Sequence, residues 1–407
     1  MPKALFLCGF LSLFGGIVLS TPQDARTLPL EDRPIDAGFE EAFVVGVETG
    51  AEHEMLFGLV DVTFSSDGEL YILEERSHRV LVYGPDGAFR RQFGREGQGP
   101  GEFQLPMTLA VTTGGEIAVW DFQNAAYLLF APSGEYLRQV RWDDWGTGPR
   151  RDTLRPWPEG GVVYLADLLQ EETDPPEDID RGVILHDPLG RDGAPQELLA
   201  VHHPRTRSKS VGGSRILDNG PAFAPTTRWD VLSDGRLAVA EGIDYRVRLV
   251  DPRAGESAVL ERAIAPRPTS DADRQRERER VRHAYENAAG ARVGPADGSG
   301  ARAGRNQPMS EGVRAIVDAV EFAETIPVIR DLRVDAEDRL WIQRHSETFF
   351  DDGPIDIVSA AGEYLGTLPP MPMPDAFGPD GTAAWMERGR DVEVERVIVR
   401  RLPAALR

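Results

Sequence analysis

The sequence predicts an all-β fold, a six-bladed β-propeller with a helical insertion before the fifth blade. Apolar positions, turn glycines and one acid recur 47 residues apart near the start of the chain. The first set is Phe64, Gly68, Leu70, Ile72, Glu74, Val80, Val82, Tyr83, Pro85, Gly87 and Phe89, and the second is Val111, Gly115, Ile117, Val119, Asp121, Tyr127, Leu129, Phe130, Pro132, Gly134 and Tyr136. A period in the forties with several short strands in each unit is typical of a β-propeller.

Each unit contains the same local signals. The pair Asp67-Gly68 supplies the positive φ of a tight hairpin turn. Leu70 and Ile72 follow, and a period of two places both side chains on one face of a strand. An acid then opens a short loop, after which residues 80–82 form the next strand. The unit is therefore a set of short antiparallel strands joined by tight turns.

Four further copies follow, around residues 161–190, 234–252, 340–364 and 380–399. The last copy stops before its fourth strand, whereas Glu41 to Glu48 is an unassigned strand near the start of the chain. We expect this strand to complete the sixth sheet, because such closure removes an exposed strand edge. An open β-sandwich of similar strand content is the alternative, but it does not need six copies of one turn pattern.

The chain opens with features of a secretory signal. Residues 4–19 are almost entirely apolar, and Val18 and Ser20 place small side chains at the positions a signal peptidase reads. The apolar run is short for a membrane span, although an uncleaved anchor is the alternative. The expected organisation is a signal peptide at 1–20, a linker at 21–38 and a propeller at 39–402, with the helical insertion at 266–325. The expected location is secreted or periplasmic.

Composition excludes several kinds of chemistry. Asp and Glu total 67 against 45 Lys and Arg, a formal net charge of −22, which disfavours binding to nucleic acids. Cys8 is the only cysteine and lies in the signal, so the mature chain has no disulfide, cysteine nucleophile or thiolate metal site. We expect a monomer without a membrane span after signal cleavage, whose partner is a protein or a small polar ligand.

Insertions interrupt the repeat. Residues 142–158 contain three tryptophans, which line a ligand site or cover a sheet edge, and residues 169–181 form an acidic loop. In the larger insertion, Thr269, Ser270 and Asp271 can cap a helix that is charged nearly all round. A second helix carries the apolar stripe Val313, Ile316, Val317 and Val320, which must pack on something. We expect a helical hairpin over one face near the fifth sheet, either as a lid or as a packing element.

One loop carries a family resemblance. The segment from Phe93 to Phe103, with glycines at 94, 97, 99 and 101, resembles the inter-blade signature of NHL-repeat proteins, as does the stretch His78-Arg79-Val80. Ser77 departs from the family pattern, which has asparagine there. The chain as a whole is similar to bacterial six-bladed (NHL/TolB-like) propellers with a secretion signal. The resemblance implies six four-stranded blades around a channel, but it implies no single function.

An acid recurs after the second strand of five copies, and the fifth copy has Arg344 or Gln343 there instead. Such positions approach the channel face, so a ring of carboxylates and one cation could bind a metal or a polar ligand. The alternative is structural, with each acid bonded to loop amides or to an arginine of its own blade. The candidate ligand-binding residues are Glu74, Arg79, Asp121, Asn124, Asp167, Glu241, Arg246, Arg344 and Glu387.

Three functions stay open from the sequence. The first, which we favour, is a binding platform for a ligand or a protein, with specificity supplied by loops on rigid sheets. The second is a propeller-type, metal-dependent lactonase or lyase, for which Glu74, Asn124 and Asp244 are the nominated ligands by resemblance. The third is a structural component of a cell-envelope assembly. We assign no catalytic residue and no cofactor, with Ca²⁺ or Zn²⁺ as the ions to test, since the seven histidines show no zinc-binding pattern.

Overall fold

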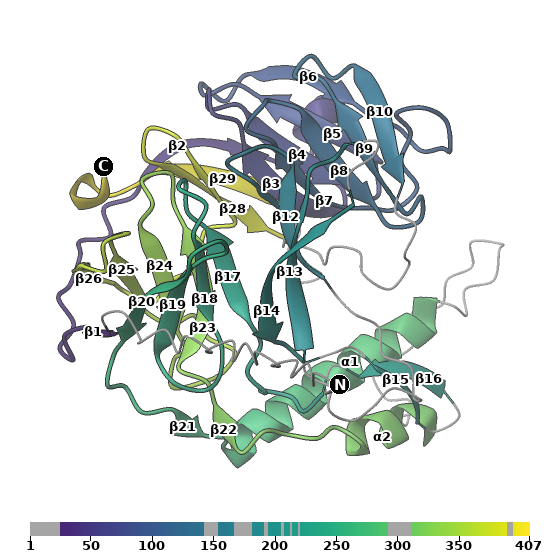
Figure 1. The fold of residues 1–407 in the computed structure, drawn as a ribbon. Coiled ribbons are helices and arrows are strands. Elements are labelled where there is room, and N and C mark those ends of the chain that lie inside the picture. Colours follow the sequence, from purple (N-terminus) through teal and green to yellow (C-terminus); the bar gives the residue numbers. More distant parts are fainter. Residues whose placement is uncertain are drawn as a thin grey trace, which may run out of the picture.

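The computed structural model describes residues 25–141, 154–166, 181–190, 194–204, 207–211, 214–218, 220–291, 311–388 and 394–407. The signal peptide, Asp167 and most of the two shorter insertions lie outside these residues. Six sheets form the blades of a propeller (Figure 1). In five of them the four antiparallel strands follow one another in sequence order, and the N-terminal strand β2 (Glu40–Val45) supplies the outer strand of the sixth. The fold class predicted from the repeat is thus confirmed.

The blades follow the chain in order. Their strands are β3 (Leu59–Phe64), β4 (Leu70–Glu74), β5 (Arg79–Tyr83) and β6 (Phe89–Phe93) in the first; β7 (Pro106–Val111), β8 (Ile117–Asp121), β9 (Ala126–Phe130) and β10 (Tyr136–Arg141) in the second; β11 (Arg155–Pro156), β12 (Val162–Ala166), β13 (Arg181–Asp187) and β14 (Gln196–His202) in the third; β17 (Arg228–Val231), β18 (Leu237–Ala240), β19 (Arg246–Asp251) and β20 (Gly255–Glu261) in the fourth; β23 (Ile329–Val334), β24 (Leu340–Arg344), β25 (Ile355–Val358) and β26 (Tyr364–Leu368) in the fifth; and β27 (Ala376–Gly378), β28 (Thr382–Glu387), β29 (Arg396–Arg401) and β2 (Glu40–Val45) in the sixth.

The core lies between neighbouring blades. The two middle strands of the first blade, β4 and β5, are buried along their whole length, as are β8 and β9 of the second. One core cluster joins Val80 and Val82 of the first blade to Leu109 and Val119 of the second. A strand that is covered on both faces needs apolar side chains on both, so each sheet is held by its two neighbours.

The repeat is reproduced in backbone detail. Gly68 and its counterpart Gly115 both have φ of +83°, in the turn between the first two strands of their blades. In the NHL-like loop, Gly94 has φ of +87° and its Cα lies against the fully buried ring of Phe103. A Cβ at position 94 would come within 2.3 Å of that ring, so only glycine fits there.

The closing strand lies where the sequence predicts it. β2 pairs antiparallel with β29, with Phe43 opposite Val399 and Val45 opposite Val397. The first strand of the propeller thereby becomes the outer strand of the last blade. This arrangement ties the two ends of the repeat region together.

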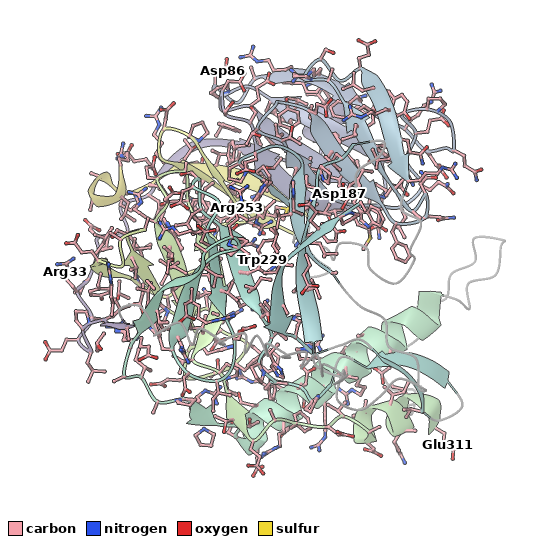
Figure 2. The ribbon with its side chains drawn as sticks, viewed as in Figure 1. Arg33, Asp86, Asp187, Trp229, Arg253 and Glu311 are labelled. Carbon is pink, nitrogen blue, oxygen red and sulfur yellow. The ribbon has the colours of Figure 1, made fainter. Side chains whose placement is uncertain are left out.

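The segment that the sequence assigns to a linker is held against the outer edges of two blades. β1 (Ala25–Thr27) adds a parallel fifth strand to β20, and Pro34 forms a parallel bridge with Thr367 of β26. Arg33, labelled in Figure 2, donates to the carbonyl oxygens of Tyr364 at 2.9 Å and Leu365 at 2.5 Å. These contacts make residues 25–37 part of the folded domain.

The helical insertion is present as predicted. It enters and leaves through the short pair β21 (Arg267–Pro268) and β22 (Thr325–Ile326), and contains α1 (Asp271–Ala291) and α2 (Glu311–Asp318). Figure 1 shows both helices below the blades in that view, next to the hairpin of β15 (Arg207–Val211) and β16 (Ser214–Asp218). The described residues also contain the 3₁₀ turns η1 (Glu52–Glu54) and η3 (Ala404–Leu406).

The predicted caps and stripes of the helices can be checked directly. Ser270 begins α1, since its Oγ accepts from the Asp273 N–H at 3.1 Å while Asp273 accepts from the Ser270 N–H at 3.1 Å. In α2, Val313, Ile316 and Val317 are buried, as the apolar stripe predicts. The two helices contact each other and α2 contacts β15, so the apolar stripe is used for packing.

Candidate functional site

The recurring acids that are described bind nearby loop or strand amides and arginines, except for the exposed Glu387. Glu74 is fully buried, and its carboxylate accepts from the Phe57 N–H and pairs with Arg79. Asp121 is also fully buried and accepts from the N–H of Gln104 at 2.7 Å. Such bonds hold the loops of the repeat, which is the structural alternative stated for these positions.

The other nominated residues are spread over several local contacts. Glu241 accepts from the His202 N–H at 2.7 Å and pairs with Arg248 at 3.0 Å, rather than with Arg246. The remaining positions are occupied as follows: Arg246 is 3.5 Å from Glu261, Arg344 is 2.7 Å from Asp32, Asn124 accepts from the Gln104 side chain, Glu387 is exposed, and Asp167 lies outside the described residues. A ligand-binding role for these nine residues stays a prediction.

The channel is a polar cavity of about 200 Å³ between the inner strands of the blades. Asp61 of β3 accepts from the Thr108 hydroxyl at 2.6 Å and from the Leu109 N–H at 3.1 Å in the next blade. Asp230 of β17 likewise accepts from the Val334 N–H of the fifth blade at 2.9 Å. Each aspartate therefore joins two blades, and its charge is taken up in holding the ring of sheets together.

A larger cavity, of about 550 Å³, lies between the helical insertion and the fourth and fifth blades, and we refer to it as the insertion pocket. Its wall consists of Val211, Gly220, Pro221, Ala222, Phe223, Ala224, Thr226, Arg228, Glu277, Arg280, Val281, Tyr285, Ile316, Ala319, Val320, Glu321, Phe349 and Phe350. Four stretches of the chain that are distant in sequence meet there. Cavities of this volume with mainly apolar walls are typical of small-molecule sites.

Backbone pairing fixes the shape of the insertion pocket. Ala222, which precedes β17, donates its N–H to the Glu321 carbonyl at 2.8 Å and accepts from the Ala323 N–H at 2.9 Å. Asp273 of α1 binds both terminal nitrogens of Arg267, at 2.8 Å and 3.1 Å, and accepts from the Phe349 N–H at 3.4 Å. Arg267 accordingly lowers the pKa of Asp273. The insertion is thus attached to both blades that border the pocket.

Aromatic rings form one side of the insertion pocket. Phe223 lies 4.3 Å from Phe349 and 5.7 Å from Phe322 between ring centroids. His345 stacks on Phe349 at 4.7 Å, and burial, followed by the charges of Arg330 and others, lowers the pKa of His345 to about 3. The imidazole is therefore neutral at physiological pH and adds no charge beside the aromatic cluster.

Charged side chains are few in the insertion pocket and are mostly paired. Glu277 is buried and forms a bidentate pair with Arg280, at 2.7 Å and 2.6 Å. Glu321 is likewise not without an interaction partner. Arg228, at the start of β17, is exposed on the pocket wall, and among the described residues its guanidinium has neither an ion pair nor a hydrogen bond.

Within the described residues, no group of three or more His, Cys, Asp or Glu side chains is arranged to hold a metal ion. Glu74 and Asn124, nominated with Asp244 as metal ligands, instead have the local partners given above. For the same part of the chain, no helix has the length and apolar character needed to cross a membrane.

Comparison with known proteins agrees with this architecture. A family model described as a 6-bladed beta-propeller matches residues 45–147, which include the first two blades. The protein is a six-bladed β-propeller. No curated protein sequence matches the chain.

Similar solved structures are propellers of diverse description. A Bacteroides fragilis protein whose description suggests export has a TM-score of 0.49 at 11% identity, over 90% of this chain and 96% of its own. A streptogramin B lyase scores 0.41 at 11% identity, over 89% and 98%. The calcium-binding protein regucalcin from Agrobacterium tumefaciens scores 0.41 at 12% identity, over 91% and 96%. At such identities the likeness concerns the fold alone.

Sequence reasoning missed the insertion pocket. It identified the helices that form one wall, but it did not nominate Arg228, Phe223 or the pair Phe349-Phe350. One signal was available, because two adjacent phenylalanines in a loop with Asp351 and Asp352 depart from the pattern of the other copies.

Proposed function

We propose that this propeller is a binding protein of the secreted or periplasmic space, and that its insertion pocket takes a small, largely apolar ligand. The observation that carries the proposal is a cavity of about 550 Å³ in whose wall four aromatic rings and several aliphatic side chains lie beside four charged residues. A rigid ring of sheets supports one side of that wall, so its geometry is fixed before a ligand arrives.

The two other functions have no comparable support in the geometry. A metal-dependent lactonase or lyase would need clustered ligands, and the nominated Glu74 is occupied by Arg79 and the Phe57 amide. A structural role in a cell-envelope assembly is favoured by no surface feature of the described residues that we can name. Binding is therefore the function that we carry forward.

The test uses the neutral fluorophore N-phenyl-1-naphthylamine, whose emission rises in an apolar site. We expect the wild-type protein to bind it saturably, with one site for each chain. Ala319→Trp places a large ring in the pocket wall and should weaken binding at least tenfold, since the added side chain occupies the ligand's space. Ala88→Trp, in an exposed turn far from the pocket wall, is the control.

Equal binding by Ala319→Trp and Ala88→Trp would place the dye elsewhere and refute the proposal. So would the absence of saturable binding by the wild-type protein. Elemental analysis of the same preparation tests the metal alternative, because one equivalent of tightly bound Ca²⁺ or Zn²⁺ would favour an enzyme.

A further inference from the structure

We infer that the ligand of the insertion pocket is an anionic amphiphile, with an acidic head group paired to Arg228 and an apolar body against the phenylalanine cluster. This inference rests on the proposed function and specifies the class of ligand. It draws on two features of the pocket: a cation without an ion pair among the described residues, and an apolar surface beside it.

The unpaired cation is Arg228. Of the four charged residues in the wall, Glu277 and Arg280 neutralise each other and Glu321 is itself partnered. Arg228 is the described wall residue whose charge is left uncompensated by an ion pair. Its five N–H donors form a planar fork that matches the oxygens of a carboxylate or a phosphate.

Paired and unpaired charges surround this part of the pocket. Arg330, Arg228 and Arg267 all act on His345 next to Phe349, and each disfavours its protonation. Two of these arginines have acids of their own, since Arg267 binds Asp273 and Arg330 lies 3.5 Å from Asp352. Arg228 also lowers the pKa of Asp331, but burial has the larger effect and raises that pKa overall. Arg228 is therefore the guanidinium of the described wall that is open to an acidic head group.

The apolar wall selects for the rest of the ligand. Phe223, Phe349 and Phe350 form a cluster with centroid separations of 4.3–6.3 Å, and Val281 and Ile316 face the same cavity from the helices. Hydrophobic surface of this kind is covered favourably by an alkyl chain or a ring. A ligand with only a charge, such as inorganic phosphate, would leave that surface wet.

The experiment displaces N-phenyl-1-naphthylamine with three ligands that share one chain length: decanoate, decyl phosphate and 1-decanol, all below their aggregation concentrations. We expect wild-type protein to bind the two anions about tenfold more tightly than the alcohol, as a charge-assisted pair contributes on this scale. The ratio between decanoate and decyl phosphate then shows whether the site prefers a carboxylate or a phosphate.

Arg228→Gln should remove the preference, reducing anion affinity about tenfold while 1-decanol and the neutral dye bind unchanged. Arg26→Gln, which removes one exposed arginine from β1 at the outer edge, is the matched control and should behave as wild type. Glu277→Gln acts in the opposite direction: it leaves Arg280 without its partner and should raise anion affinity severalfold.

The outcomes separate this inference from the proposed function. If the dye binds in the pocket but anions and alcohol compete equally, or Arg228→Gln does not change the ratio, the anionic class is wrong and the binding function stands. If neither the dye nor any decyl compound binds, the proposed function fails as well. Arg228→Gln could also lose all three ligands and melt at a lower temperature, and Glu277→Gln then decides the outcome. If Glu277→Gln shows no increase in anion affinity, the inference is overturned.

Discussion

The buried ion pair between Arg262 and Asp356 is the scaffold contact whose loss we expect to lower the free energy of unfolding most. Both side chains have no solvent-exposed surface, and Nη1 of Arg262 lies 2.8 Å from Oδ2 of Asp356. Arg262 ends the fourth blade, and it also donates to the Pro29 carbonyl at 2.6 Å and pairs with Asp32 at 2.7 Å. The pair thus joins two blades and the N-terminal segment.

Asp356→Asn keeps the shape of this site and removes its charge. The amide can still accept from the Thr367 hydroxyl, which lies 2.6 Å from Oδ1, but its NH₂ group then faces the donors of Arg262. As an ionic partner Arg262 retains only Asp32, whose side chain is 43% exposed, and Arg344 loses one of its two acids in the same change. Removing one partner of a buried pair costs about 3–5 kcal/mol, a large part of the stability of an ordinary domain.

Thermal unfolding measures this cost. At about 2 °C for each kcal/mol, the low end of the scale for large domains, we expect the melting temperature of Asp356→Asn to fall by about 6–10 °C. Asp86→Asn removes a carboxylate that pairs with Arg90 on the exposed surface, and it should leave the midpoint unchanged. Equal midpoints for Asp356→Asn and Asp86→Asn would refute the reasoning.

A double variant tests whether the cost arises from the unpaired charge. Arg262→Met combined with Asp356→Leu removes both charges and leaves apolar side chains in a buried site. Paired replacements of this type are often close to neutral, so the double variant should be more stable than the sum of the two single effects predicts. A strictly additive result would assign the loss to packing instead.

Three further perturbations test other parts of the structure. A chain that starts at residue 46 lacks β2 and should melt well below one that starts at residue 39, because only the first leaves the edge of β29 open; equal midpoints would contradict closure by β2. The pKa of His345 is lowered to about 3, against 6.5 in the unfolded chain, so the unfolded state binds more protons between those two pH values. Stability should therefore fall as the pH drops from about 6.5 toward 3, and His345→Asn should flatten that slope in pH-dependent melts. Asp273→Asn should accelerate tryptic cleavage within α1, since Asp273 attaches the helix to Arg267 and Phe349, whereas the exposed Asp271→Asn should not; identical cleavage rates would argue against this attachment.

The architecture was predictable because each blade of a propeller repeats the same sequence pattern. The turn glycines Gly68 and Gly115 and the buried middle strands recur with the period, and even the closing strand could be inferred from the missing strand of the last copy. Period-two burial and turn chemistry are local signals, and six copies of each make the fold class robust to the failure of any one.

The candidate site was predictable only in part, for a physical reason. The pocket wall joins residues 211, 220–228, 277–285, 316–321 and 349–350, and no period relates these positions to one another. Their proximity depends on how the insertion packs on the blades, through contacts such as Asp273 with the Phe349 amide. The contacts of the N-terminal segment also depend on residues distant in sequence, since Arg262 and Tyr364 hold residues 29–33.

The fifth copy differs from the other copies at the end of its second strand, and this difference contributes to the insertion pocket. In the first blade, Glu74 ends the second strand and fixes a loop of residues 75–78 through Arg79 and the Phe57 amide. In the fifth blade Arg344 occupies that place, turns to Asp32 and Asp356, and is followed by the longer loop 345–354. That loop carries Phe349 and Phe350 to the insertion pocket, with His345 stacked on Phe349. Residues shared by the copies make the hydrogen bonds and ion pairs that hold the blades, so a ligand is best recognised where one copy departs from the pattern.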